Sequence, residues 1–306
     1  MLASESGLHP GVGVRAVRVR RFGGPEVLEV GEVAAPGGGE VLVRTVASSV
    51  NPVDDKTREG VFPGIALPAT LGWDLAGIVV GGVGFEVGQR VVAMSHQLSS
   101  GVGTWAEVVA LPARAVAPAP SSVSLLDAAT LPLAGLTAWQ TLDWLGVAAG
   151  ERVLVAGGAG AVGALAVQLA RARGAVVDAL VSRAGHVELV RGFGAEVVAT
   201  EAGGLRRYDA VFDTFGAFAT EAVVDGGRYA SVASQARPVP DLSHRGVRTT
   251  VNQVREDGDA LRRLAALVDD GLLRTRVDSV YGVQDVRAAH ERFRRGRLDG
   301  KVVLAF

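Results

Sequence analysis

The chain has 306 residues, of which 48% are hydrophobic and 21% are charged, and its formal net charge is −1. This length and composition predict a packed protein of about two domains, and the near-zero charge argues against general nucleic-acid binding, which needs a surplus of basic residues on one face. Cysteine is absent, which excludes disulfides, thiolate metal ligands and a cysteine nucleophile. We find no apolar segment of signal-peptide or membrane-spanning length, so we expect a cytoplasmic protein.

The first third of the chain consists of short Val-rich segments separated by Gly and Pro, a pattern typical of strands. The predicted strands are 14–23, 27–33, 40–50, 74–83, 89–94 and 104–112. Their regular spacing favours a barrel-like or partly open β domain.

Helical apolar spacing begins near residue 121, and from Arg152 onward strands and helices alternate. The predicted strands are 152–157, 176–181, 196–199, 209–213 and 228–233, and the predicted helices are 161–173, 186–193 and 218–224. This alternation predicts βαβ units around a doubly wound parallel sheet, and therefore an α/β fold.

The last part of the chain begins with a predicted strand over 246–254 and a helix over 258–270. The tail that follows reads strand, helix, turn, strand, which resembles the first domain more than the middle one, so we expect the chain to return to that first domain. The strand at 246–254 is a candidate for pairing with its copy in a homodimer.

A glycine cluster lies between the strand at 152–157 and the helix at 161–173. Gly158, Gly160 and Gly163 form G-x-G-x-x-G in the strand–turn–helix setting that a dinucleotide-binding turn requires. Glycine lets the backbone approach a pyrophosphate, and the helix start at Ala161 and Val162 offers free N–H groups. The alternative interpretation is a tight turn with no ligand.

The end of the second strand of this region distinguishes NAD from NADP. An acidic residue there would bind the ribose 2′-hydroxyl, but the sequence has Ser182 and Arg183. The planar guanidinium of Arg183 suits a 2′-phosphate, which predicts NADPH. The alternative is a solvated loop arginine.

Six segments carry a resemblance to a known family over nearly the whole chain. They are NPVDDKTREG (51–60), LGWDLAGIVVGGV (71–83), GVGTWAEVVALP (101–112), AATLPLAGLTAWQTL (128–142), AGGAGAVGALAVQLAR (156–171) and GRLDGKVVL (296–304). In this order they resemble the zinc-free quinone oxidoreductase (zeta-crystallin-like) group of the medium-chain dehydrogenases/reductases. The resemblance implies a GroES-like catalytic domain formed by 1–125 and 272–306, and a Rossmann NADPH-binding domain over 126–271.

The resemblance also bears on metal binding. Zinc-dependent relatives carry a cysteine and a His-Glu pair where this chain has Asn51 and Trp73–Asp74. Asn and Trp are poor zinc ligands, so we predict no metal and exclude a zinc alcohol dehydrogenase mechanism.

Several candidate site residues follow from the resemblance. Asn51 is expected near the nicotinamide or its ribose, and Asp54 is expected either to contact the ribose or to order its loop; these two are the catalytic candidates. Thr137 and Lys301 resemble residues near the cofactor phosphates, with a helix back-bond and a turn lysine as the alternatives. His96 is a candidate proton donor or a solvated histidine.

Other candidates lie where predicted strands of the parallel sheet end, because ligands line that edge. Phe215 and Gly216 are expected to flank the adenosine, and Val232 and Ser234 to lie on the nicotinamide side.

Three functions are consistent with these features. The first is an NADPH-dependent reductase of quinones or other α,β-unsaturated carbonyl compounds, which need less electrophilic assistance than a simple carbonyl does. The second is a stand-alone enoyl reductase acting on a thioester or polyketide-type intermediate. The third is a non-catalytic NADPH-binding protein with a structural or sensing role.

Overall fold

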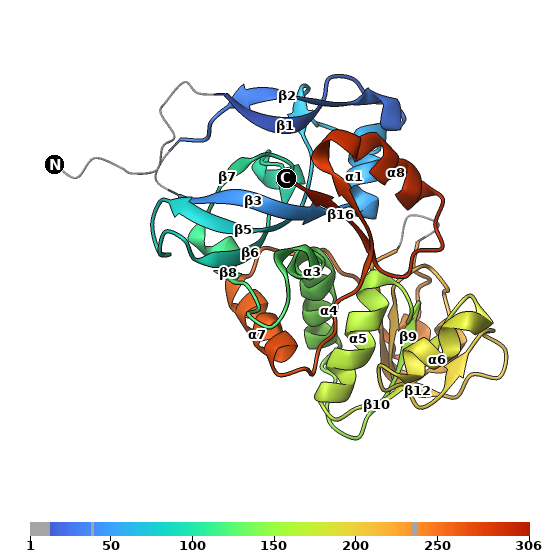
Figure 1. Cartoon of the computed structure of the whole chain (residues 1–306). Coiled ribbons are helices and arrows are strands. Elements are labelled where there is room, and N and C mark those ends of the chain that lie inside the picture. Colours follow the sequence, from blue (N-terminus) through green and yellow to red (C-terminus); the bar gives the residue numbers. More distant parts are fainter. Residues whose placement is uncertain (1–12, 38–39, 234–237) are drawn as a thin grey trace. The chain divides into compact units, whose positions relative to one another are not determined.

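A computed structural model describes residues 13–37, 40–233 and 238–306 (Figure 1). The chain forms two compact units. The first consists of Met1–Leu133, Arg255–Asp270 and Thr275–Phe306, and the second of Ala134–Val254 and Gly271–Arg274. Within the described residues, no helix combines the length and the apolar character that crossing a membrane would need.

The first unit is rich in strands. One sheet has the order β2 (Leu28–Ala34), β1 (Gly13–Val19), β4 (Ala69–Thr70). A second sheet has the order β15 (Val277–Gly282), β16 (Lys301–Ala305), β3 (Val41–Ser49), β5 (Asp74–Gly81), β6 (Arg90–Met94), β8 (Val116–Pro118), and β7 (Val108–Leu111) also pairs with β3. The C-terminal strand β16 runs antiparallel to β3, with Val303 opposite Ser49, so the tail completes this sheet.

Short helices complete the first unit. They are α1 (Pro52–Glu59), α2 (Gln97–Ser100), α3 (Leu125–Ala128), α7 (Gly258–Asp269) and α8 (Val286–Arg294). Helix α8 packs on β15 and β16 and contributes Val286 and Ala289 to the hydrophobic core.

Helix α7 belongs to the first unit, whereas the sequence placed 258–270 in the Rossmann domain. The helix packs against β8 and β6. Its first residue is glycine for a steric reason, because a Cβ on Gly258 would lie 2.5 Å from the carbonyl oxygen of Val116. The predicted domain limits at 125 and 271 therefore differ from the limits of the compact units. The apolar face of the helix was predictable, but the sheet that it covers was not.

The second unit contains a parallel sheet. Its strand order is β11 (Val198–Ala199), β10 (Val176–Leu180), β9 (Arg152–Ala156), β12 (Tyr208–Asp213), β13 (Val223–Ser231), β14 (Arg248–Val251). Its helices are α5 (Ala161–Ala172), α6 (Val187–Arg191) and most of α4 (Pro132–Leu145), which begins in the first unit. Residues 153–156 of β9 are all buried, as expected of a strand covered on both faces. This arrangement confirms the predicted α/β fold.

One predicted helix is wrong. The structure has no helix over 218–224; a short 3₁₀ turn at Thr220–Ala222 leads directly into β13 at Val223. The cause is Asp213, whose carboxylate accepts backbone N–H groups from Phe215 to Phe218 and folds that segment into a loop.

Candidate functional site

The glycine cluster lies between β9 and α5, as predicted, and Gly158 and Gly163 are sterically required. A Cβ on Gly163 would lie 2.0 Å from the carbonyl oxygen of Gly157, and one on Gly158 would lie 2.9 Å from the Cβ of Ala179. Helix α5 has Gly160 as its N-cap and no side-chain cap. The N–H groups of its first turn, at Ala161, Val162 and Gly163, therefore have no intrahelical partner and can bind an anion.

The carboxyl ends of the parallel strands bring several predicted residues to one edge. Ala156 of β9 pairs with Leu180 on one side and with Asp213 on the other, and Asp213 pairs with Ser231. The residues that follow these strand ends are Gly157 and Gly158, Ser182 and Arg183, Phe215 and Gly216, and Val232. Ser234, also predicted here, lies outside the described residues.

Ser182 and Arg183 follow β10 at this edge. Ser182 is exposed and Arg183 is half-buried, with extended backbone at φ −140° and ψ 133°. No acidic side chain among the described residues forms an ion pair with Arg183. Its guanidinium is therefore available to an anionic ligand.

The carboxylate of Asp213 holds the neighbouring loop in place, a role that the sequence analysis missed. Asp213 is fully buried and accepts the N–H groups of residues 215–218 and the hydroxyl of Tyr229. The loop presents Phe215, which is 49% exposed although aromatic. The ring of Phe215 lies against the glycine turn, since a Cβ on Gly157 would be 2.9 Å from Phe215 Cδ1. The signal available in the sequence was an aspartate at the end of a predicted strand, immediately before the residues T-F-G.

Thr137 is buried on α4 of the second unit. Its carbonyl oxygen accepts a hydrogen bond of 2.7 Å from the hydroxyl of Thr141, one turn later on the same helix. Thr141 also accepts a hydrogen bond from the Asn252 amide. The phosphate role of Thr137 stays a prediction.

A buried polar cluster in the first unit contains Asn51 and Lys301. The Lys301 ammonium donates to Asn51 Oδ1 at 2.6 Å and to Asp74 Oδ2 at 2.7 Å. Asn51 Nδ2 donates to Asp74 Oδ2 at 2.8 Å and to the carbonyl oxygen of Ser49 at 3.2 Å. Asn51 is 4% exposed and Lys301 5%, and Asp74 is fully buried. These residues come from the loop before α1, the start of β5 and the start of β16.

Asp74 is the centre of this cluster, and the sequence analysis assigned it no role. Besides Asn51 and Lys301, it accepts the hydroxyl of Ser49 at 2.5 Å and the backbone N–H of Leu133 at 2.6 Å. A buried carboxylate is tolerated when hydrogen-bond donors of this kind surround it. The carboxylate thereby ties together three strands and the first turn of α4.

Asp54 forms a capping box at the start of α1. Its side chain accepts the N–H of Asn51 at 2.8 Å, and it also accepts the N–H of Gly72 at 3.2 Å. Burial raises the pKa of Asp54 to about 8, which the hydrogen bonds only partly oppose. Because the side chain has no exposed surface, its position supports the alternative in which it orders the loop.

The donor set of this cluster does not fit zinc. The ammonium of Lys301 lies within hydrogen-bonding distance of both Asn51 and Asp74, so a cation already faces the two oxygens that a metal would use. Across 13–37, 40–233 and 238–306, no three His, Cys, Asp or Glu side chains converge as metal ligands. No step through a metal follows from these residues.

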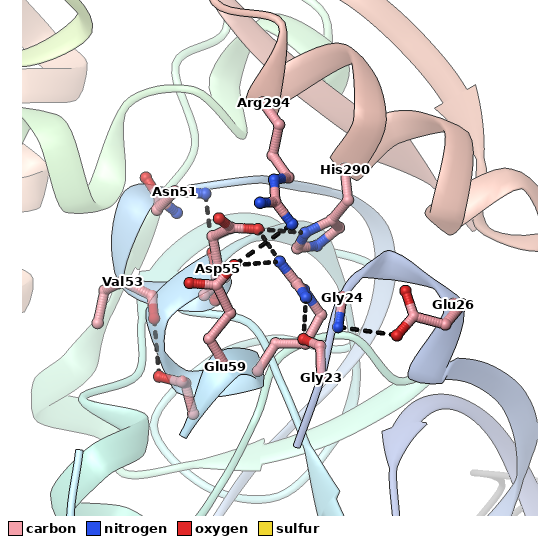
Figure 2. Close-up of polar contacts among 12 residues, drawn as sticks. Gly23, Gly24, Glu26, Asn51, Val53, Asp55, Glu59, His290 and Arg294 are labelled. Atoms are coloured by element: carbon pink, nitrogen blue, oxygen red, sulfur yellow. Dashed lines mark hydrogen bonds and ion pairs between the residues drawn. The ribbon is translucent and has the colours of Figure 1, made fainter. Parts of the chain in front are cut away.

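Helix α1, which begins after Asn51, is also anchored to α8 (Figure 2). Asp55 and His290 point toward each other, with 3.3 Å between Asp55 Oδ1 and His290 Nδ1, and the fully buried Arg58 donates to Asp55 and to the carbonyl oxygen of Gly23. Burial alone would raise the pKa of Asp55, but hydrogen bonds from His290 and Arg58 outweigh it and lower the pKa to about 2. Arg294 adds an ion pair to Glu59. These contacts hold the helix that begins beside Asn51.

His96 lies just beyond β6, beside the start of β5. Its ring packs against Trp73 with 4.6 Å between ring centroids, its Nδ1 is 2.9 Å from the Ser99 hydroxyl, and its backbone N–H donates to Glu256. His96 is therefore held in place, with its side chain half-buried. Its role as a proton donor stays a prediction.

Comparisons with known proteins agree with this architecture. Residues 37–121 match a family model described as an alcohol dehydrogenase GroES-like domain, and residues 185–304 match one described as a zinc-binding dehydrogenase. Among solved structures, a quinone oxidoreductase from Coxiella burnetii is similar with a TM-score of 0.87 and 26% identity, covering 96% of this chain and 100% of that one.

Curated relatives resemble the chain over most of its length. A 2-methylene-furan-3-one reductase of Solanum lycopersicum is 32% identical over 92% of this chain and 76% of its own length. A chloroplastic NADPH-dependent alkenal/one oxidoreductase of Arabidopsis thaliana is 32% identical over 92% and 77%. A quinone oxidoreductase of Pseudomonas aeruginosa is 29% identical over 95% and 99%. From its fold, its glycine turn and these likenesses, the chain belongs to the quinone oxidoreductase group of the medium-chain dehydrogenases/reductases.

Proposed function

We propose that this protein is an NADPH-dependent reductase that transfers hydride to a quinone or another α,β-unsaturated carbonyl compound. The observation that carries the proposal is the edge of the parallel sheet, where two neighbouring strands lead into the turn with Gly158 and Gly163 and into Arg183. Gly158 and Gly163 are sterically required, and Arg183 has no acidic partner within the part of the chain that the structure describes. The relatives named for alkenal/one, furanone and quinone reduction support the same chemistry.

Each residue at the edge has a binding role that suits the cofactor. The glycines admit the pyrophosphate, and the first N–H groups of α5 bind it. We assign the 2′-phosphate to Ser182 and Arg183, the adenosine to Phe215 and Gly216, and the nicotinamide side to Val232. Bound NADPH would supply the hydride.

The cluster around Asn51 limits the choice of acceptor. A simple carbonyl needs strong electrophilic assistance, usually from a metal, whereas a conjugated acceptor delocalises the incoming charge onto its oxygen. The donor set at Asn51, Asp74 and Lys301 does not fit zinc, which supports a conjugated acceptor. By the family resemblance, Asn51 serves the reacting end of the cofactor, and Asp54 orders its loop.

The test is NADPH oxidation, measured by absorbance, with a panel of quinones, a panel of enones and an enoyl thioester. Turnover with quinones or enones is the expected result. Turnover with the thioester alone would replace this proposal with the enoyl reductase. NADPH binding without turnover on any acceptor would favour the non-catalytic role.

We also propose that the protein is a homodimer through β14. This strand is at one edge of the parallel sheet, and its Val251 is 42% exposed. An unpaired edge strand can add a second copy across a two-fold axis. Light scattering coupled to size-exclusion chromatography should give twice the 31.5 kDa chain mass, and a monomeric mass would refute the proposal.

A further inference from the structure

Lysine is rare in this chain, and one of its lysines lies in the buried cluster. The chain has 31 Lys and Arg residues, and only Lys56 and Lys301 are lysine. Lys56 is half-buried on α1, while Lys301 is 5% exposed. A chain that uses arginine for nearly every cation has an ammonium at this buried position, where oxygens of Asn51 and Asp74 converge.

The contacts of Lys301 explain why an ammonium is present. Its nitrogen reaches one oxygen of Asn51 and one oxygen of Asp74 at 2.6 and 2.7 Å. An ammonium is a compact charge that can donate to two separate oxygens, whereas a guanidinium is a wide planar fork that suits both oxygens of one carboxylate. The other Asp74 oxygen already accepts the N–H of Leu133, so a fork has no matching acceptor pair.

These contacts fix the orientation of the Asn51 amide. An amide has two N–H donors and one carbonyl oxygen. Both donors are used, on Asp74 and on the carbonyl oxygen of Ser49, and the oxygen accepts from Lys301. A reversed amide would place its NH₂ against the ammonium and its oxygen against the carboxylate. Without the ammonium, the Asn51 oxygen loses its charged donor and keeps only its capping-box contact with the backbone N–H of Asp54.

We propose that Lys301 is a positioning residue, whose ammonium holds the Asn51 amide in one orientation and balances the buried Asp74 carboxylate. In this orientation the Asn51 oxygen faces Lys301, and the NH₂ group faces Asp74 and the carbonyl oxygen of Ser49. The kinetic part of this proposal rests on the proposed reductase function. The structural part does not.

A direct test uses the scarcity of asparagine, because Asn51 and Asn252 are the only two in the chain. Selective ¹⁵N-asparagine labelling therefore gives two side-chain NH₂ groups in an NMR spectrum. Lys301→Met should shift the Asn51 NH₂ signals and accelerate their hydrogen exchange by about tenfold or more, as expected for loss of a charged hydrogen bond. Asn252 should stay unchanged and serves as the internal reference. Unchanged Asn51 signals in a folded variant would overturn the proposal.

Lys301→Met leaves Asp74 without its cation, so the variant can lose stability. The double variant Lys301→Met with Asp74→Asn removes both charges and should recover stability, measured by urea unfolding. We expect it to keep a kcat at least about tenfold below wild type, with the KM for NADPH within about threefold. Recovery of kcat together with stability would make Lys301 a purely structural partner and overturn the proposal. Lys56→Met is the matched control and should retain wild-type kinetics.

The absence of cysteine allows the charge to be restored chemically. Lys301→Cys is alkylated in denaturant with 2-bromoethylamine, which makes a lysine analogue at residue 301 alone, and is then refolded beside wild type taken through the same cycle. The aminoethyl group should restore turnover and the Asn51 NMR signals. The neutral hydroxyethyl group from 2-bromoethanol should restore neither, and equal rescue by both would overturn the proposal. If wild type reduces no acceptor, the function proposal fails, and the NMR result alone still decides the positioning role.

Discussion

The hydroxyl of Tyr229 on β13 donates a hydrogen bond of 2.7 Å to Oδ2 of Asp213 at the end of β12. Both side chains are fully buried. The same carboxylate accepts the N–H groups of residues 215–218, so Tyr229 braces the loop that carries Phe215.

Tyr229→Phe should lower the free energy of unfolding by about 1–2 kcal/mol, because a buried carboxylate loses one hydrogen bond but keeps its backbone donors. Urea unfolding measures the change. Tyr281→Phe, at a half-buried tyrosine on β15, is the control and should change the free energy by less than about 0.5 kcal/mol. Equal effects of the two variants would show that the Asp213 contact contributes nothing specific.

Arg183→Ala should raise the KM for NADPH about 10- to 100-fold, the value of a charge-assisted hydrogen bond to phosphate, and should change the KM for NADH little. Steady-state kinetics with both cofactors measure the difference. Arg191→Ala, on the exposed side of α6 where Arg191 pairs with Glu188, should affect neither KM. Equal increases for NADPH and NADH would remove Arg183 from the 2′-phosphate role.

Gly163→Ala should destabilise the second unit by about 1–3 kcal/mol through overpacking and should abolish tight NADPH binding. The added Cβ would lie 2.0 Å from the carbonyl oxygen of Gly157, so the turn or the helix must shift. Thermal unfolding and a fluorescence titration with NADPH measure the two effects. Gly185→Ala is the matched control, since its Cβ would meet no atom within 4 Å. Wild-type affinity in Gly163→Ala would contradict the assignment of this turn.

Asp54 should make stability fall as pH rises. Its pKa in the folded protein is about 8, whereas an unfolded aspartate has a pKa of about 4. Between these values the folded state holds a proton that the unfolded state has released, so folding is favoured at the acidic end of the window. The contribution is lost at up to about 1.4 kcal/mol per pH unit and is constant above the folded pKa.

Urea unfolding of wild type and Asp54→Asn at pH 5, 6.5 and 8 measures this contribution. Wild type should lose more stability than the variant from pH 5 to pH 8, because asparagine cannot ionise. Other groups titrate equally in both proteins and cancel in the comparison. Parallel profiles would show that Asp54 is already ionised at pH 5.

The sequence by itself determined what depends on local pattern. Val-rich alternation marked β1 to β3, β5 and β6, and the G-x-G-x-x-G spacing after a strand placed the turn at Gly158 to Gly163. The strand and helix patterns on either side of this spacing show that its glycines form a tight turn between two elements. The replacement of zinc ligands at Asn51 and Trp73 was equally readable, because it depends on which side chains are present rather than on where they lie.

Only the tertiary structure decided which distant residues meet. Lys301 follows Asn51 by 250 positions and bonds to it, since antiparallel pairing of β16 with β3 brings the last strand beside the first part of the chain. The sequence indicates only that Asp213 ends a strand. In the structure its carboxylate accepts backbone N–H groups of the next residues and folds them into a loop, where a helix was predicted. The apolar periodicity of α7 predicts that one face of the helix is buried, but it does not specify which sheet covers that face. Side-chain packing and hydrogen bonding across the folded chain select the partner, and those energies are absent from any local window of sequence.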